Sequence, residues 1–319
     1  MAHNRLILDT DGGVDDAQAL LLLIAAGRTP DLITTVFGNV GLEAATRNIL
    51  STLAIAGLDV PVHKGASLPL TQPIIDATYI HGEDGLGGAP RPSQSASPSS
   101  DDAIGVLRAS FRAAAARGEK VDILMIGPLT NLALALRLEP AILAGIGQLT
   151  IMGGTVYGRG NTTAAAEFNI FADPEAASIV FSTAIDIVVV PWEPCVTHYM
   201  TGPEVDALFA PLPAGPEKVF SQSLAGHARQ TIAGYGGGDA FRFVDPLAAA
   251  VVIDPSIVTK SVRASIDVAL APGITRGMTV VDPTGRLGTP KVTIVEEARL
   301  DRLVALYAAS IAYRPNKTS

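Results

Sequence analysis

The fold is decided by the stretch Leu6-Ile7-Leu8-Asp9-Thr10-Asp11-Gly12-Gly13-Val14-Asp15-Asp16-Ala17. Its first three residues form a short apolar run that is typical of a buried strand. Residues 14–26 are rich in helix-forming side chains, and Gly27 stands where a glycine commonly ends a helix. A strand, an acidic loop and a helix therefore follow one another directly, as they do in the first half of a βαβ unit.

The alternation of strands and helices continues along the chain. Further strands are expected at residues 32–37, 121–126, 149–152, 185–190, 261–269 and 279–282. Helices are expected at residues 43–56, 101–117, 129–138, 174–182 and 300–312. Such alternation is typical of a parallel sheet covered by helices on both faces. We therefore expect one α/β domain over residues 1–319, with a mostly parallel, Rossmann-like open sheet flanked by helices.

Composition excludes several classes of protein. Of the 319 residues, 48% are hydrophobic and 17% are charged, so the chain is not disordered. The formal net charge is −8 without a cluster of Lys or Arg, which argues against a nucleic-acid partner. The longest apolar stretch, residues 17–26, is too short to cross a membrane, and no targeting segment is recognisable. Cys195 is the single cysteine, which indicates a reducing, cytoplasmic location.

Acids and amides gather where the expected strands end. Asp9, Asp11, Asp15 and Asp16 follow the first strand, and the ends of later strands lead to Asn39, Thr130, Asn131, Asn161, Glu167 and Asn169. In open α/β sheets, ligands bind beyond the carboxyl ends of the strands. One edge of the sheet is therefore expected to form a polar binding site.

The four aspartates near the N-terminus repel one another, and no Lys or Arg lies between Arg5 and Arg28 to neutralise them. Burying unpaired carboxylates is costly, so a divalent cation is expected among them. Oxygen ligands select a hard ion, Ca²⁺ or Mg²⁺. The alternative is that these aspartates only cap a helix and solvate a loop. Their number and the matching polar edge favour the cation.

Residues 9–17 resemble the DxDPGxDDA signature of the inosine–uridine-type nucleoside hydrolases, with Gly12 in place of the usual proline. Further elements similar to motifs of that family follow in order over most of the chain: Phe37-Gly38-Asn39, His81-Gly82-Glu83-Asp84-Gly85-Leu86-Gly87, Gly127-Pro128-Leu129-Thr130-Asn131, Met152-Gly153-Gly154, Ala166-Glu167-Phe168-Asn169, Asp173-Pro174-Glu175-Ala176, Val244-Asp245-Pro246-Leu247-Ala248 and residues 276–282. Any one element could arise by chance, but the ordered series makes the resemblance specific.

The resemblance implies an enzyme that hydrolyses the N-glycosidic bond of ribonucleosides to ribose and a free base. It implies Ca²⁺ held by the carboxylates of Asp11, Asp16 and Asp245 and by the backbone carbonyl of Thr130, with Asp11 as the base that deprotonates the attacking water. Positions that match the family's ribose-binding residues are Asp15, Asn39, Asn161, Glu167 and Asn169, with Met152 packed beside the sugar. The resemblance also implies a homodimer or homotetramer.

General chemistry agrees with these roles. Cleavage of the glycosidic bond passes through a sugar that resembles an oxocarbenium ion, and acidic groups around the ribose stabilise its positive charge. A metal ion lowers the pKa of its bound water. A 2′-deoxyribose would leave buried acceptors unpaired, so ribose is expected to be preferred.

One position departs from the family pattern. Relatives whose motif reads HDPLA carry a histidine thought to protonate the leaving base, and some purine-preferring relatives carry a tryptophan that stacks on it. This chain has Val244, which does neither. Arg242 and Tyr235, beside the glycine-rich residues 234–238, and His81 are the candidate substitutes. Arg242 is equally compatible with a solvated surface residue. The aromatic residues around Arg242 favour purine nucleosides slightly.

Two other functions are compatible with parts of the sequence. Asp9-Thr10-Asp11 after an apolar strand superficially fits a haloacid-dehalogenase-type phosphatase, with Asp9 as nucleophile and Mg²⁺ as the metal, but no convincing downstream lysine and acidic pair follow. A Ca²⁺-dependent nucleoside- or sugar-binding protein without turnover is the second alternative. The presence of Asp11 argues against it, because binding alone does not need a base.

Overall fold

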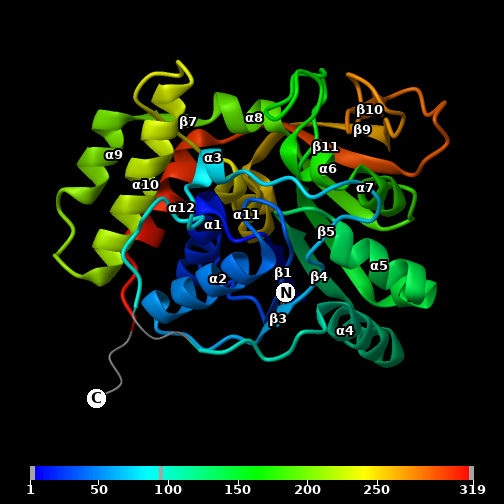
Figure 1. Cartoon of the computed structure of the whole chain (residues 1–319), viewed down its shortest axis with the longest axis horizontal. Coiled ribbons are helices and arrows are strands. Elements are labelled where there is room, and N and C mark those ends of the chain that lie inside the picture. Colours follow the sequence, from blue (N-terminus) through cyan, green and yellow to red (C-terminus); the bar gives the residue numbers. More distant parts are fainter. Residues whose placement is uncertain (1–3, 93–95, 316–319) are drawn as a thin grey trace.

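A central sheet organises the protein, and the computed structural model describes residues 4–92 and 96–315 of it (Figure 1). Within these residues, nine strands lie in the order β10-β9-β11-β6-β5-β4-β1-β2-β3. Their bounds, in chain order, are Arg5–Thr10 (β1), Leu32–Thr35 (β2), Val62–Lys64 (β3), Val121–Met125 (β4), Ile146–Met152 (β5), Asp186–Val190 (β6), Val258–Val268 (β9), Thr279–Asp282 (β10) and Lys291–Ala298 (β11). β9 pairs antiparallel with both of its neighbours, and the other pairs are parallel, as the sequence predicted.

Helices cover both faces of the sheet. One face is covered by α1 (Val14–Ala25), α2 (Leu42–Ala56), α11 (Asp245–Ile253) and α12 (Leu300–Ala312), with α10 (Pro216–Gly234) packed against α1. The other face is covered by α4 (Ala103–Arg117), α5 (Thr130–Leu138) and α7 (Pro174–Phe181). Along β1, Leu6 and Leu8 belong to the first core and Ile7 to the second, because successive strand residues point to opposite faces.

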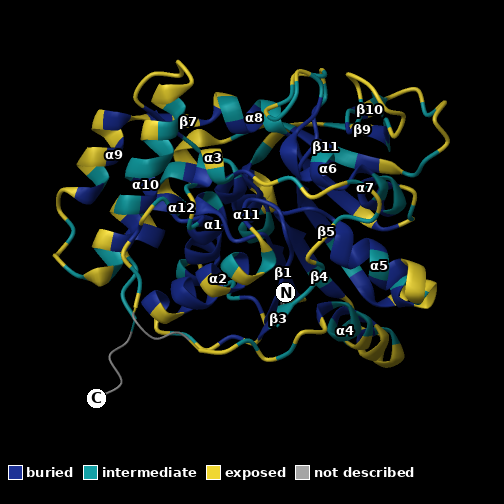
Figure 2. Ribbon diagram, viewed as in Figure 1, coloured by how far each residue is buried: buried dark blue, intermediate teal, exposed yellow. Residues whose placement is uncertain are grey.

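The elements nearest the sheet centre are the most deeply buried. α1 and α11 are almost wholly buried, whereas α4 and α9 (Gly202–Phe209) expose one side (Figure 2). Full burial of one Leu or Ile side chain stabilises a fold by about 1.5–3 kcal/mol. α1 alone contributes Leu20, Leu21, Leu22, Leu23 and Ile24 to the core.

The strands and helices expected from the sequence are confirmed within a few residues of their ends. Gly27 follows α1 with φ of +71°, as expected for a glycine that ends a helix. Several elements were not predicted, including β11, α10 and the small sheet formed by β7 (Tyr199–Thr201) and β8 (Ala240–Arg242). α10 buries few residues, so its apolar stripe is too short to stand out in the sequence.

The remaining helices are short and lie in the connections between the longer elements. They are α3 (Thr78–His81), α6 (Phe168–Ala172), α8 (Trp192–Thr197) and the 3₁₀ helices Pro140–Gly145 and Pro255–Ile257. Among the described residues, no helix is both long and apolar enough to span a membrane.

The strand order reverses beside β1. From β1 the chain moves outward to β2 and β3, and then returns to place β4 on the other side of β1. At such a reversal the loops diverge and leave a crevice beyond the carboxyl ends of the strands. The acidic loop after β1 lies at this point.

Gly12 fixes the acidic loop against α2. Its φ is +67°, a conformation that proline cannot adopt, so the glycine that replaces the family's usual proline suits this backbone. A Cβ at Gly12 would lie 2.5 Å from the Cα of Ala45 and 2.6 Å from its carbonyl oxygen. The Asn48 Nδ2 donates to the Gly12 carbonyl at 2.8 Å and to the Asp84 carbonyl at 2.9 Å. The acidic loop therefore contacts the backbone of α2 directly.

We expect Gly12→Ala to destabilise the protein more than Gly27→Ala. Both glycines have positive φ, which costs alanine about 1–2 kcal/mol, but nothing lies within 4 Å of a Cβ at Gly27. The contact with the α2 backbone adds about 1–3 kcal/mol at Gly12. Denaturant unfolding of the two variants measures the difference, and equal losses of stability would contradict this geometry.

Candidate active site

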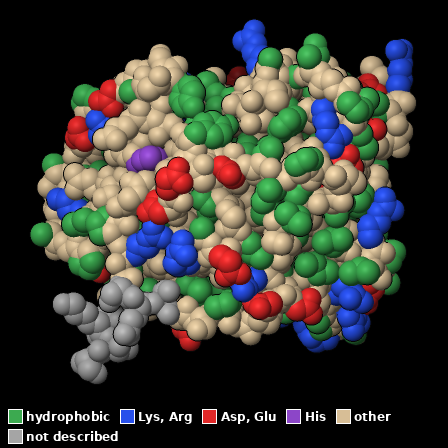
Figure 3. All heavy atoms as spheres, in the orientation of Figure 1, with side chains coloured by type: hydrophobic (Ala, Val, Ile, Leu, Met, Phe, Trp, Pro, Cys, Tyr) green, Lys and Arg blue, Asp and Glu red, His purple; other side chains and the backbone are tan. Residues whose placement is uncertain are grey.

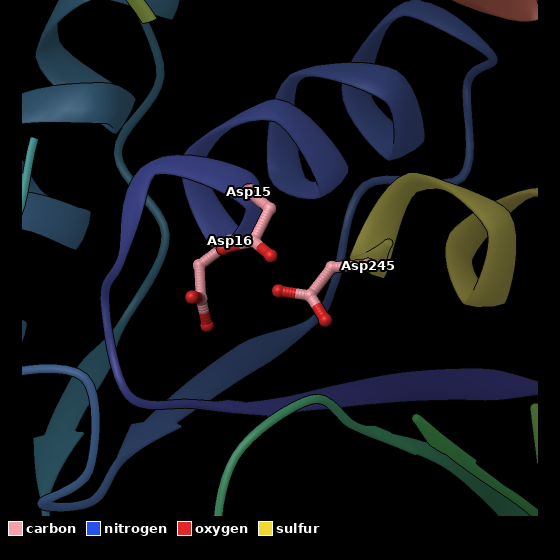
Figure 4. A group of neighbouring side chains, drawn as sticks. All are labelled: Asp15, Asp16 and Asp245. Carbon is pink, nitrogen blue, oxygen red and sulfur yellow. The ribbon is translucent and has the colours of Figure 1, made fainter. Parts of the chain in front are cut away.

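Three carboxylates meet where two helices begin. Asp15 and Asp16 lie in the first turn of α1, and Asp245 is the first residue of α11. One carboxylate oxygen from each lies within 4.8 Å of the other two. Figure 4 shows the three side chains turned toward one another from the starts of the two helices. Two helix N-termini favour nearby negative charge by only about 0.3–1 kcal/mol each, which does not offset the burial of three carboxylates.

Asn39 connects Asp11 to this cluster. The Asp11 carboxylate accepts hydrogen bonds from the Asn39 backbone N–H at 2.8 Å and from Nδ2 at 2.9 Å. The same Nδ2 donates to Asp16 at 2.9 Å, and the Gly13 backbone N–H donates to Asp16 at 2.8 Å. Thr10 Oγ1 donates to the other Asp16 oxygen. The protein therefore orients Asp11 and Asp16 through donors of its own.

Asp15 and Asp245 have oxygens that lack such donors. The Asp15 Oδ1 is buried without a hydrogen-bond partner, and the Asp245 carboxylate accepts no hydrogen bond from the described residues. Burial raises the pKa of Asp15 to about 6. Burial, with repulsion from Asp15, Asp16 and Asp11, raises the pKa of Asp245 well above its usual range. One carboxylate oxygen of Asp15 lies within 4.8 Å of one of Asp245.

A divalent cation fits this arrangement. None of the described Lys or Arg residues forms an ion pair with Asp11, Asp15, Asp16 or Asp245, so their charge is not compensated by the protein. The unpaired carboxylate oxygens of Asp15 and Asp245 can coordinate a cation. Because all of the available ligands are oxygens, they select a hard ion. The family is metal-dependent, and the acidic cluster is the candidate site for its metal.

A cavity of about 410 Å³ opens beside the cluster. Its lining includes most of the site residues expected from the sequence: Asp15, Asn39, His81, Met152, Asn161, Glu167, Asn169, Tyr235, Arg242 and Asp245. Asp11, Asp16 and Thr130 are fully buried and do not line it. The Thr130 hydroxyl donates to Asp173 at 2.7 Å. That Asp11 and Thr130 bind the metal stays a prediction, and the structure brings Asp15 into the cluster in addition.

Polar side chains from the β5–α6 loop form one wall. Glu167 caps α6 by accepting from the backbone N–H groups of Asn169 (2.9 Å) and Ile170 (3.2 Å), and also accepts from that of Gly154 (2.8 Å). Burial raises its pKa to about 7. The Asn161 Oδ1 accepts from the Phe168 N–H at 2.8 Å, which leaves its amide N–H groups without a described partner. This wall can bind hydroxyl groups.

His81 lies beside Asp15 in a defined protonation state. Its Nδ1 accepts a hydrogen bond from the Val14 N–H at 3.1 Å, so a neutral ring carries its proton on Nε2. Burial lowers the pKa of His81 to about 4, which keeps the ring neutral at pH 7. The Asp15 Oδ1 lies 3.6 Å from Nδ1. His81 can therefore donate a hydrogen bond from Nε2.

Val244, Arg242 and Tyr235 also line the cavity. Arg242 forms neither an ion pair nor a side-chain hydrogen bond with the described residues, and burial lowers its pKa. The side chain is only half-buried, so Arg242 is not a fully solvated surface residue. Tyr235 follows α10 and is 69% exposed. An unpaired guanidinium in a cavity is available to a ligand.

Some lining residues were not expected from the sequence. They are Gln18, Trp192, His227, Thr231 and Ile232. His227 Nε2 and Thr231 Oγ1 both lie within hydrogen-bond distance of the Ile80 carbonyl, at 2.8 and 3.2 Å, and so connect α10 to α3. His227, Thr231 and Ile232 could not be assigned from the sequence, because α10 itself was not predicted.

Asp9 does not belong to the site. Its carboxylate accepts from Thr34 Oγ1 and from Asn131 Nδ2, is fully buried, and does not line the cavity. A nucleophile must reach its substrate, so the phosphatase alternative, which required Asp9 to attack, does not fit.

Comparison with known proteins gives consistent matches. The family described as "Inosine-uridine preferring nucleoside hydrolase" matches residues 6–305. The chain is 38% identical over 298 residues to the "Non-specific ribonucleoside hydrolase RihC" of Salmonella enteritidis PT4, covering 91% of each chain. It is similar to the solved structure of a plant nucleoside hydrolase, PpNRh1, with a TM-score of 0.86 and 28% identity over 98% of this chain and 99% of that one. It is also similar to the solved structure of a purine-preferring ribonucleoside hydrolase from Gardnerella vaginalis, with a TM-score of 0.86 and 27% identity over 97% of this chain and 98% of that one.

Agreement in fold over nearly the full length of both chains defines the protein as a nucleosidase, an N-glycosyl hydrolase that acts on ribonucleosides. Within that class, the chain belongs to the inosine-uridine preferring nucleoside hydrolase family. The resemblance that the motifs indicated is confirmed.

We expect a divalent cation to stabilise the protein through the acidic cluster. A ligand that binds only the folded state at a hundred times its Kd adds about 2.7 kcal/mol, so Ca²⁺ or Mg²⁺ should raise the midpoint of thermal unfolding by several degrees. Asp245→Asn should remove most of this shift, whereas Asp59→Asn, on the exposed surface, should keep it. If neither ion shifts the wild-type midpoint, the cluster does not bind a cation.

Proposed function

We propose that the cavity binds a ribonucleoside and that the enzyme hydrolyses its N-glycosidic bond with the aid of Ca²⁺, giving ribose and a free base. One observation carries the proposal: the uncompensated acidic cluster and the side chains that can bind hydroxyl groups border the same cavity. Ca²⁺ accepts six to eight oxygens, enough for protein carboxylates, a water and sugar hydroxyls.

We assign the ribose to the polar side of the cavity. Asp15, Asn39, Asn161, Glu167 and Asn169 would hold its hydroxyl groups, and Met152 would pack beside the ring. Asn169 is well oriented for this role, because its Nδ2 donates to the Met152 carbonyl at 3.1 Å and its Oδ1 is left for a ligand. The Asp15 and Glu167 carboxylates would also stabilise the positive charge that develops on the sugar.

Asp11 is the proposed general base. The Asn39 backbone N–H and Nδ2 donate to its carboxylate at 2.8 and 2.9 Å and so orient it, and from there it would accept the proton of the attacking water. Ca²⁺, held by Asp11, Asp16, Asp245 and the Thr130 carbonyl, would supply a water of lowered pKa. The water oxygen would bond to the anomeric carbon as the bond to the base nitrogen breaks.

Activation of the leaving base is assigned to Arg242, Tyr235 and His81. Departure of the base leaves negative charge on its nitrogen, and each of these side chains presents an N–H or O–H donor in the cavity. Val244, at the family's histidine position, cannot donate. Trp192 adds an aromatic side chain to the cavity. A slight preference for purine nucleosides is proposed on this basis, since aromatic walls stack better on larger bases.

We further propose a homodimer or homotetramer in the cytoplasm without a nucleic-acid partner. Leu68, Ile74 and Ile274 are exposed apolar side chains that burial between copies would cover. On the face drawn in Figure 3, the Lys and Arg side chains of the described residues are dispersed. Cys195 is buried and unpaired.

The substrate class is tested with inosine, adenosine, guanosine, uridine and cytidine. We expect release of ribose and base from each, loss of activity on chelation, and recovery with Ca²⁺. Asp11→Asn should lower kcat at least about 100-fold, since it removes the general base. Release of phosphate from p-nitrophenyl phosphate, or calorimetric binding of nucleosides without turnover, would overturn the proposal in favour of a phosphatase or a binding protein.

Leaving-group activation is tested with Arg242→Ala and Tyr235→Phe. If these residues assist departure of the base, kcat for inosine should fall about 10- to 100-fold, while a nitrophenyl riboside, whose anion leaves without a donor, should be hydrolysed at close to the wild-type rate. Arg47→Ala, at an exposed position on α2, is the matched control. Wild-type turnover of inosine by both variants would exclude Arg242 and Tyr235 from this role.

A further inference from the structure

Gln18 is a buried amide without a partner. It lies on α1, is 4% exposed, and lines the cavity. Its Nε2 is buried and has no hydrogen-bond partner among the described residues, and its Oε1 accepts no hydrogen bond from them either. Most buried polar groups in proteins are paired, so this amide requires an explanation.

The fold itself does not explain Gln18. Its neighbours on α1 include Ala17, Ala19 and Leu21, and an apolar side chain of the same length would fill the position without an unpaired amide. An unpaired buried amide lowers the stability of the folded protein unless a ligand or water binds it. An unpaired amide beside a cavity is therefore a candidate to hydrogen-bond a ligand in that cavity.

The position of Gln18 indicates which part of the ligand it meets. It follows Asp15 by three residues, so it lies about 4.5 Å further along the axis of α1 and on the same side. α1 packs against α10 and α11. Ala228 and Ile232 of α10 and Val244, just before α11, belong to the apolar lining of the cavity. Gln18 thus lies on the helix that packs against this part of the lining.

We propose that the Gln18 carboxamide hydrogen-bonds the nucleobase of the bound nucleoside and allows both oxo- and amino-bases to bind. The proposal rests on the proposed function, because it assigns one further contact in the same cavity. Gln18 is then a specificity-determining residue that touches the base, whereas Asp15, on the same helix, touches the sugar.

Tolerance of both kinds of base follows from the chemistry of the amide. A carboxamide presents one acceptor oxygen and two donor N–H groups, and a half-turn of its terminal bond exchanges them. No described residue fixes the orientation of Gln18, so the amide can donate to a base carbonyl or accept from a base amino group. Arg242 has only donors and cannot make this exchange.

The experiment compares wild type with Gln18→Met, which keeps the length of the side chain and removes its hydrogen bonds. We expect kcat/KM to fall about three- to tenfold for inosine and adenosine alike, the loss of one neutral hydrogen bond. Inhibition by ribose should not change, because ribose lacks the base. The variant should also unfold about 2–4 °C higher, since it buries no unpaired amide.

Tyr307→Phe is the matched control. The Tyr307 hydroxyl is also buried without a described partner, but it lies in the core beside Phe241 and Phe243 and does not line the cavity. This variant should gain stability and keep wild-type kcat/KM. A gain of stability with loss of activity only at Gln18 would identify its amide as a ligand contact.

Three results would overturn the proposal: an unchanged kcat/KM for both substrates in Gln18→Met, weaker inhibition by ribose, or a loss confined to one of the two bases. Failure of the proposed function is distinguishable, because wild type would then hydrolyse no nucleoside. In that case, calorimetry with inosine still decides the Gln18 contact. Weaker binding to Gln18→Met than to wild type would support it, and equal binding would exclude it.

Discussion

Mutual repulsion among buried carboxylates is the constraint on which the site depends. Asp11, Asp15, Asp16 and Asp245 lie at the reversal point of the sheet without a described Lys or Arg partner, and the backbone is arranged to keep them there. Gly12 contacts α2 directly, Asn39 donates to two of the carboxylates, and two helices start beside the cluster. Without a bound positive charge, these carboxylates lower the stability of the folded protein. The arrangement is therefore best explained as a binding site for positive charge. In the proposed reaction, a cation and the sugar on which positive charge develops would supply that charge.

The sequence predicted the central sheet because its strands contain apolar runs such as residues 187–190, and because Gly27 and Pro174 mark a helix end and a helix start. It did not predict β11 or α10. In β11 the alternation of polar and apolar residues covers only residues 291–294, and α10 buries only a short stripe, so neither pattern is distinct from its surroundings. Such elements are stabilised by the partners they meet in three dimensions, which local sequence does not record.

The candidate site, like the fold, could be predicted from the sequence only in part. Asp16 and Asp245 could be assigned from motifs, and the structure brings them together with Asp15. Gln18, Trp192 and His227 could not, because each has an ordinary structural explanation in the sequence and becomes notable only through the cavity that it lines. Asp9 is the converse case. It stands in the acidic motif, yet its carboxylate faces Thr34 and Asn131 within the sheet. A motif indicates which residues are chemically suited to a site, and the burial of each side chain determines whether it can contact the ligand.

The acidic cluster joins the first helix of the chain to a helix near its end, and this has a consequence for biosynthesis. During translation Asp15 and Asp16 leave the ribosome early, while Asp245 emerges only after most of the sheet has been made. A nascent chain that stops short of α11 lacks the third carboxylate of the cluster. A cation bound as proposed between Asp16 and Asp245 would therefore stabilise only molecules in which α1 and α11 have already packed together.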